Sequence, residues 1–201
     1  MPVIAIVGAQ WGDEGKGKVV DRLAEKSSMV VRFSGGDNAG HTVINPLGEF
    51  KLHIIPSGIF YPHTICLISN GVVINPKVLI SELDRLNEHG VDTSRLFISD
   101  RAHLIMPYHI LLDGLEEELR AGKALGTTRK GVGPAFTDKA ARLGIRASDL
   151  LDKQALLDRL RSVLEYKNTI LTKVYGTNPL SLEEVYDEYC RYAEYLAPFI
   201  T

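Results

Sequence analysis

Glycine, lysine and acidic residues are concentrated between residues 8 and 18 of this 201-residue chain, in the sequence GAQWGDEGKGK. Gly12, Gly15 and Gly17 permit backbone conformations and close approaches that a Cβ atom would obstruct. Lys16 can place an ammonium group beside phosphate oxygens. The spacing therefore predicts a phosphate-binding loop, with an ordinary strand-to-helix turn as the alternative.

The standard P-loop pattern is only half present in this segment. Aligning it on Gly15-Lys16 puts Gln10 at the first glycine and Gly17 where the magnesium-binding hydroxyl should be. A metal ion bound with the phosphates would need another oxygen donor, and Asp13 is an available carboxylate inside the loop. Asp13 is thus the candidate metal ligand.

Two further loops are rich in small and polar residues. In the first, at residues 34–42, Asn38 offers a donor and an acceptor, Thr42 a hydroxyl, and His41 a group that could act as general acid. A surface or structural role is the alternative for His41. The second loop, at residues 126–134, combines hydroxyls and two cations suited to a substrate phosphate. Arg142 follows in an expected helix, where a solvated position is the alternative.

The pattern of apolar residues indicates the elements that position these loops. The continuous apolar run at 2–9 is typical of a buried parallel strand, and a helix is expected at 18–26. Asn75-Pro76 predicts a helix to about residue 88, and Leu111, Leu112, Leu115 and Leu119 predict the inward face of a helix over 108–121 that Gly122 ends. Further strands are expected at 29–33, 41–45, 50–55, 65–68 and 96–99.

This alternation of strands and helices predicts an α/β fold. We expect a mostly parallel central sheet with flanking helices, similar to P-loop NTPases. Beyond residue 147 the pattern is helical, with a possible capping box at Ser181 and Glu184. We interpret 1–201 as part of a single domain, divided into an α/β portion at 1–146 that binds nucleotide and a helical segment at 147–201. The abrupt apolar end at 198–201 suggests a fragment.

Bulk composition excludes several classes of protein. The hydrophobic fraction is 45%, the charged fraction is 24%, and the formal net charge is −2. Such a chain is globular rather than disordered, and it has no overall field that attracts nucleic acid or membrane phosphates. Cys66 and Cys190 lack metal-ligand spacing and are expected to be buried thiols. No signal peptide or membrane-spanning run is evident, so we expect a cytoplasmic protein.

Four motifs together resemble one known family. QWGDEGKGK at 10–18, NAGHT at 38–42, IPSG at 55–58 and GTT…GVGPA at 126–135 are similar in order and spacing to adenylosuccinate synthetase. The resemblance extends over essentially the whole chain, and the segment after Ala147 carries its weakest signature. It implies a GTP-dependent carbon–nitrogen ligase of purine and AMP biosynthesis, which joins IMP and L-aspartate and releases adenylosuccinate, GDP and phosphate.

The resemblance also implies a role for each matching residue. Asp13 resembles the general base and a magnesium ligand, His41 the general acid, Lys16 a group on the transferring phosphate, and Gly40 a backbone ligand of Mg²⁺. The implied GTP-binding residues are Gly12, Asp13, Glu14, Gly15, Lys16, Gly17, Lys18, Gly40, His41 and Thr42. The implied IMP-binding residues are Asp13, Glu14, Gly15, Lys16, Asn38, Ala39, Gly40, His41, Thr128 and Arg142.

Arg142 resembles an arginine that reaches the IMP site of the neighbouring subunit, which implies a homodimer. Known members of the family are considerably longer, and their later part supplies guanine recognition and aspartate binding. We therefore expect the 201-residue chain alone to be inactive or weakly active. Two alternatives remain open: a noncatalytic nucleotide-binding domain, and another P-loop phosphoryl-transfer enzyme.

Overall fold

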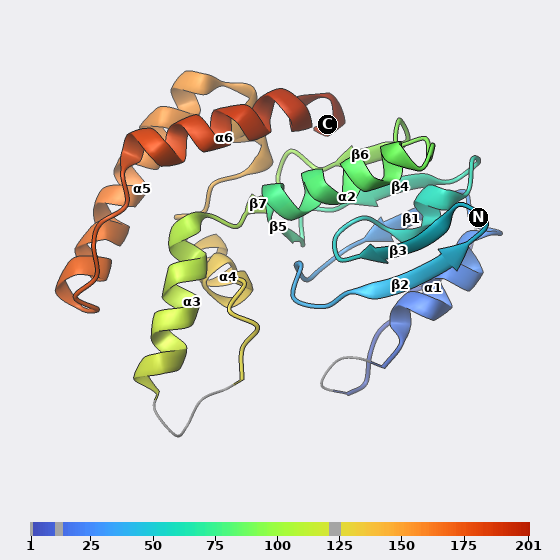
Figure 1. Cartoon of the computed structure of the whole chain (residues 1–201), viewed down its shortest axis with the longest axis horizontal. Coiled ribbons are helices and arrows are strands. Elements are labelled where there is room, and N and C mark those ends of the chain that lie inside the picture. The colour runs from blue at the N-terminus through green and yellow to red at the C-terminus, as the bar shows by residue number, and fades with distance from the viewer. Residues whose placement is uncertain (1, 11–13, 121–125) are drawn as a thin grey trace.

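The computed structural model describes residues 2–10, 14–120 and 126–201, and it forms an α/β fold (Figure 1). Its central element is a parallel sheet of β1 (Met29–Arg32), β4 (Ile65–Ile68) and β6 (Leu96–Ile98), in the order β1-β4-β6. In this register Val31 lies opposite Leu67, and Leu67 lies opposite Phe97. The expected parallel sheet with flanking helices is thus confirmed.

Two smaller pairs of strands accompany this sheet. β2 (His41–Asn45) and β3 (Gly48–Leu52) form an antiparallel hairpin, whereas β5 (Val73–Ile74) and β7 (His103–Leu104) pair in parallel. A short 3₁₀ helix, η1 (Ser57–Phe60), lies between the hairpin and β4. The hairpin places His41 at the start of a strand, directly after the loop that contains Asn38.

One face of the central sheet packs into the main hydrophobic core. Cys66, Ile68, Leu96 and Ile98 are buried there together with residues of α2 (Pro76–Glu88) and α6 (Leu182–Leu196), which lie close to the strands in Figure 1. Asn75 caps α2 as predicted, since its side chain accepts a hydrogen bond from the Val78 amide at 3.4 Å. The core therefore joins the sheet to the helical segment.

The opposite face of the same sheet is open. Met29 and Val31 of β1 alternate with half-buried residues, whereas Ile65 of β4 and Phe97 of β6 alternate with buried ones. The exposed fractions of these four side chains range from 36% to 50%. Strand residues separated by two positions share a face. These four side chains therefore form one apolar surface, which we call the open sheet face.

The region after residue 147 is helical, as predicted. It contains η2 (Ala147–Leu151), α5 (Lys153–Lys173), α6 and η3 (Ala197–Phe199). Asp152 caps α5 by accepting hydrogen bonds from two backbone amides, and the Ser181 hydroxyl accepts one from the Glu184 amide at 3.3 Å. Among the described residues, no helix is long and apolar enough to cross a membrane.

The strand expected at residues 2–9 is not formed. Residues 2–8 have no regular structure, and Val3, Ile4 and Val7 are 94%, 68% and 72% exposed. A continuous apolar strand is stable only when both of its faces are covered. The described residues supply no layer over the open sheet face. A strand that joined the sheet at its edge would extend this uncovered face, and half of its apolar side chains would stay in water.

The inward face expected for the helix over 108–121 is confirmed for Leu112 and Leu115 and wrong for Leu111 and Leu119. α3 runs over Pro107–Leu119 and packs against α4 (Val132–Ala140). Leu112 is buried and Leu115 is half-buried against the main core, but Leu111 and Leu119 are 40% and 72% exposed. The buried positions are instead Tyr108, His109, Leu112, Asp113 and Glu117. Hydrogen-bonded polar groups, rather than leucines alone, face α4. The expected end of this helix at Gly122 lies outside the described residues.

Candidate active site

The N-terminus of α1 (Lys16–Ala24) is the first part of the candidate site. Gly15 precedes the helix with φ 78°, a left-handed conformation that favours glycine, and no side chain caps the first turn. Among the described residues, the first amides of α1 are therefore left without a side-chain cap at the positive end of a helix dipole, a known setting for phosphate. Trp11, Gly12 and Asp13 lie outside the described residues.

Lys16 and Glu14 form an ion pair beside this helix end. The other oxygen of Glu14 accepts a hydrogen bond from the Gln10 amide at 3.1 Å. The hydrogen bond from Lys16 lowers the pKa of the Glu14 carboxyl to about 2. Lys16 is partly exposed, so an incoming phosphate could replace Glu14 as the partner of its ammonium group.

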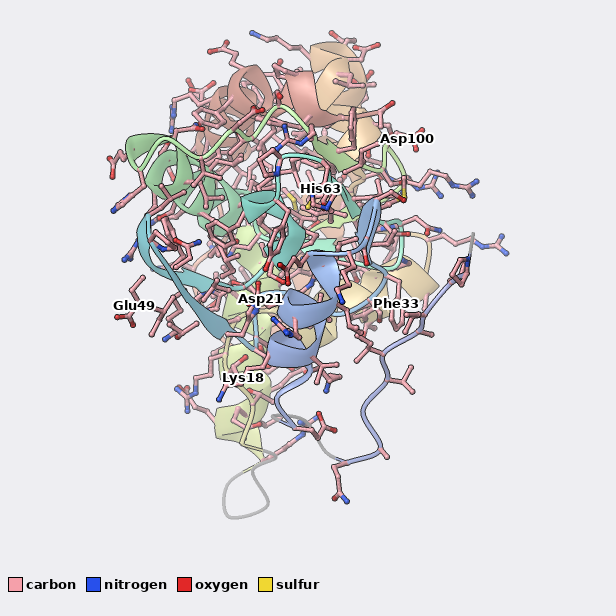
Figure 2. The ribbon with its side chains drawn as sticks, turned by 90° about the vertical axis from the view of Figure 1, so that its right-hand side faces the viewer. Lys18, Asp21, Phe33, Glu49, His63 and Asp100 are labelled. Carbon is pink, nitrogen blue, oxygen red and sulfur yellow. The ribbon has the colours of Figure 1, made fainter. Side chains whose placement is uncertain are left out.

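His41 packs directly against α1. A Cβ atom added to Gly17 would lie 2.5 Å from Cγ of His41, so only glycine leaves room for the ring. Figure 2 shows α1 with Lys18 near its first turn and Asp21 one turn further along. The contact brings together the predicted phosphate loop and the predicted general acid, which come from segments more than 20 residues apart.

The surroundings of His41 favour its neutral form. Burial lowers its pKa, the positive charge of Arg32 lowers it further, and Asp21 opposes these effects. Within the described part of the chain, the His41 Nε2 atom is buried without a hydrogen-bond partner, as are Nε of Arg32 and Oδ1 of Asp37. Buried polar atoms are nearly always paired with protein, water or ligand. Arg32 interacts electrostatically with both His41 and Asp37, so a polar ligand or water bound near Arg32 is a candidate partner for these atoms.

The loop that leads to His41 is anchored by buried groups and presents exposed ones. Asp37 is 1% exposed and accepts a hydrogen bond from the Asn75 side chain at 3.3 Å. Its backbone oxygen accepts another from Lys130 at 2.6 Å. The next residues face solvent, namely Asn38, Ala39, Gly40 and, beyond His41, Thr42. The anchors thus hold the predicted nucleotide-binding residues at the surface.

The Lys130 contact joins this loop to the third glycine-rich segment. Gly36 also lies so close to Val132, at the start of α4, that an added Cβ would be 2.8 Å from its side chain. Thr128, the predicted IMP-binding residue, is exposed two positions before Lys130. The structure therefore brings together α1, the loop before His41 and the segment at 126–132.

Glu82 of α2 supports the site from within the core. Its carboxylate accepts hydrogen bonds from the amides of His53, Ile54 and Ile55, over distances of 2.6 to 3.2 Å. The His53 ring in turn lies against Gly40, where an added Cβ would be 2.9 Å away. Sequence reasoning missed Glu82, His53, Arg32 and Asp37, because only the fold shows that they meet.

Arg142 does not lie within a helix, contrary to expectation. α4 ends at Ala140, and Arg142 has φ 63° in the turn that follows. Its side chain is exposed, and its backbone oxygen accepts a hydrogen bond from Arg159 at 2.6 Å. The described residues of this chain therefore leave the Arg142 side chain facing outward.

The candidate metal ligands are only partly described. No group of three or more His, Cys, Asp or Glu side chains with the arrangement of a metal site occurs among the residues that the structure describes. Asp13 lies outside them, and Gly40 is an exposed loop residue. Carboxylate and carbonyl oxygens are ligands that suit Mg²⁺, which is commonly held by one or two carboxylates and by substrate phosphates. The residue types expected as ligands, a carboxylate and a backbone carbonyl, are thus ones that suit Mg²⁺.

Comparison with known proteins gives one consistent result. The family model for adenylosuccinate synthetase matches residues 5–201. The adenylosuccinate synthetase of Dehalococcoides mccartyi is 66% identical over 200 residues, and that of Carboxydothermus hydrogenoformans is 56% identical over 201. Each comparison covers all of this chain and 47% of the relative. The chain thus spans about half the length of the curated relatives it matches.

Solved structures agree with this result. A fully ligated adenylosuccinate synthetase from Plasmodium falciparum matches with a TM-score of 0.83 and 34% identity, over 96% of this chain and 45% of that one. The succinoaminodeoxyadenylate synthetase of cyanophage S-2L, bound to dGMP and dATP, matches with a TM-score of 0.51 and 28% identity. That second match covers 66% of this chain and 36% of the other.

Proposed function

This chain belongs to the adenylosuccinate synthetase family, and on that premise we propose that it carries the phosphate-handling half of a GTP-dependent carbon–nitrogen ligase. In the proposed reaction GTP phosphorylates the 6-oxygen of IMP. The amino group of L-aspartate then displaces that phosphate, which gives adenylosuccinate, GDP and phosphate. The activity lies in AMP biosynthesis.

The contact between His41 and Gly17 is the observation that carries this proposal. It places a titratable imidazole, whose Nε2 atom lacks a protein partner among the described residues, beside the uncapped N-terminus of α1. A γ-phosphate held by those amides would lie within reach of the ring. A negatively charged phosphate would also favour the protonated imidazole that a general acid requires.

The remaining roles follow from the chemistry of each group. Asp13 would take the N1 proton of IMP, which increases negative charge on the 6-oxygen and makes it a better nucleophile. Lys16 and His41 would stabilise charge on the transferring phosphoryl group. Mg²⁺, held by Asp13 and the Gly40 oxygen, would neutralise charge on the GTP phosphates. Each proton-transfer group typically contributes about 10²–10⁴-fold in rate.

The IMP site is proposed to include Asn38 and Thr128, both exposed on the loops that Lys130 connects. Arg142, which faces outward, would reach the IMP of a second subunit in a homodimer. Guanine and aspartate recognition would come from the length of the relatives that this chain does not span. Cytoplasmic location and the division at residue 147 stay predictions.

The test is ligand binding to the chain, combined with a turnover assay. Calorimetry with GTP and Mg²⁺ should detect binding that His41→Ala and Lys16→Ala weaken, whereas Lys153→Ala, on the distant helix α5, should leave it unchanged. Incubation with IMP, GTP and aspartate should form little or no adenylosuccinate. Turnover at the rate of the D. mccartyi relative would contradict the expectation that half the length is insufficient.

The same assay separates the alternatives. Nucleotide binding that is indifferent to IMP would favour a noncatalytic domain, and phosphoryl transfer to another acceptor would favour a different P-loop enzyme. Because the cyanophage protein binds dGMP and dATP, this pair should be tested beside IMP and GTP. Tighter binding of dGMP than of IMP would overturn the proposed substrate.

A further inference from the structure

Three residues of α3 face the segment 126–138 from successive turns of the helix. His109, Asp113 and Glu117 are spaced four residues apart, so they share one face. They are 0%, 7% and 6% exposed. We call them the polar stripe of α3. Titratable side chains are rarely buried in the middle of a helix without a specific partner. The groups that they contact therefore indicate what role they have in the structure.

Each member of the polar stripe holds a different point of the facing segment. Glu117 Oε1 accepts hydrogen bonds from the amides of Gly126 at 2.5 Å and Thr127 at 3.4 Å. Asp113 Oδ2 accepts one from the Gly131 amide at 2.9 Å. His109 Nε2 donates to Asp138 Oδ2 at 2.9 Å. The stripe thus fixes the start of the loop, the start of α4 and the end of α4.

The held loop has a backbone that would not keep its shape unaided. Gly126, Arg129 and Gly131 have φ of 71°, 53° and 76°, and Arg129 is not a glycine. Such conformations persist where the surroundings over-determine them. Gly131 also packs against the α3 backbone, since an added Cβ would lie 2.8 Å from the carbonyl carbon of His109. The anchors on α3 therefore determine the loop conformation.

The residues between the anchors are the ones available to a ligand. The carboxylates occupy the amides of Gly126, Thr127 and Gly131 from the α3 side, while Thr128 and Arg129 are exposed. We propose that Asp113 and Glu117 are positioning residues, which hold the 126–131 loop in the shape that binds the phosphate of a purine nucleoside monophosphate. The ligand part of this inference rests on the proposed function.

Whether loss of the Glu117 carboxylate strengthens or weakens IMP binding distinguishes a positioning role from a purely electrostatic one. If Glu117 acted on a phosphate only through its negative charge, removing that charge would strengthen phosphate binding. If Glu117 positions the loop, Glu117→Ala should weaken IMP binding by about tenfold, the worth of a hydrogen bond to a charged acceptor. Glu117→Gln should bind nearly as well as the wild type, because its amide oxygen can still accept from the Gly126 amide.

The experiment combines amide hydrogen exchange with titrations of IMP and inorganic phosphate. Exchange at Gly126 and Thr127 should accelerate about tenfold in Glu117→Ala and be largely restored in Glu117→Gln. Asp113→Ala should affect Gly131. Glu116→Ala is the matched control, because it removes the same charge from α3 and Glu116 pairs only distantly with Arg120, at 3.9 Å. Amides of α5 should exchange as in the wild type throughout.

Three results would overturn the positioning role. These are unchanged exchange at Gly126 and Thr127 in Glu117→Ala, tighter IMP binding by both Glu117 variants, and an equal loss of binding in Glu116→Ala. If the wild-type chain binds no IMP, the proposed function is contradicted for this chain. In that case the positioning role is decided by amide exchange alone. Exchange at Gly126 and Thr127 in Glu117→Gln, which preserves the size of the side chain and one acceptor oxygen, is then compared with exchange in Glu117→Ala.

Discussion

Removal of the Asp138 charge is the perturbation whose effect the structure defines most closely. Asp138 lies between His109 and Lys167, and Lys167 donates to its Oδ1 at 2.5 Å. Burial opposes ionisation of Asp138, but the hydrogen bonds from His109 and Lys167 outweigh it and hold its pKa below the usual value. Asp138→Asn would leave the Lys167 ammonium buried at 5% exposure without its counter-charge.

Loss of one partner from a buried ion pair costs about 3–5 kcal/mol. The rings of Tyr108 and Tyr166 lie 5.7 and 5.6 Å from the Lys167 ammonium and offset part of the loss, so we expect a value near 3 kcal/mol, at the lower end of that range. The free energy of unfolding of a typical domain is about 5–15 kcal/mol. Asp138→Asn therefore removes a large share of the stability.

Urea unfolding followed by circular dichroism at pH 7 measures this loss. The double variant Asp138→Asn with Lys167→Met should recover most of it, because both charges are then gone. Glu194→Gln breaks an exposed pair with Lys153 and should change stability by less than about 0.5 kcal/mol. A loss below about 1 kcal/mol in Asp138→Asn would refute the reasoning.

Three further predictions concern other parts of the chain. Burial, with the charges of Lys139 and Arg146, lowers the pKa of His103 from 6.5 to about 4, so the unfolded chain is protonated first as the pH falls. In urea melts, the loss of stability between pH 7.5 and pH 5 should be about 1–2 kcal/mol larger in the wild type than in His103→Gln, which keeps His41 and His109, whose pKa values burial also lowers. In the same melts, Gly131→Ala should lower the free energy of unfolding by about 2 kcal/mol or more, because its φ of 76° and the nearby α3 backbone both oppose a Cβ atom. Gly133→Ala is the control: it has open space around the added Cβ and should raise the free energy of unfolding by about 0.5 kcal/mol. GTP with Mg²⁺ should raise the pKa of His41 in an NMR titration, and Gly17→Ala, which displaces the ring, should abolish that rise; a His41 pKa that nucleotide leaves unchanged would contradict the proposed acid.

Local signals predicted those elements whose stability is local. Asn75 and Pro76 determine the start of α2, and the side chain of Ser181 caps α6, so both helix starts are found where the sequence places them. The parallel strands were recognisable because short apolar runs lie between turn residues. The described parts of three family motifs, at 10–18, 38–42 and 126–135, likewise lie in the segments that the structure brings together.

Tertiary effects account for the failures. The strand at 2–9 depends on cover from both sides, which no property of its own residues reveals. In α3 the leucines and the polar stripe offer two faces with helical spacing, and only the anchors at Gly126, Gly131 and Asp138 decide which one turns inward. Lys130 and Asp37 are 93 residues apart, so their contact was invisible to any local pattern.

The open sheet face has a practical consequence for handling the protein in solution. Among the described residues, no strand pairs with the side of β1 that faces away from β4. An unpaired strand edge is a template for strands of other molecules, and here it borders an exposed apolar surface of the kind that promotes aggregation. The apparent molar mass measured by light scattering should therefore rise with protein concentration. One charge on that surface, as in Val31→Lys on the edge strand β1, should improve solubility without altering the proposed nucleotide-binding loops.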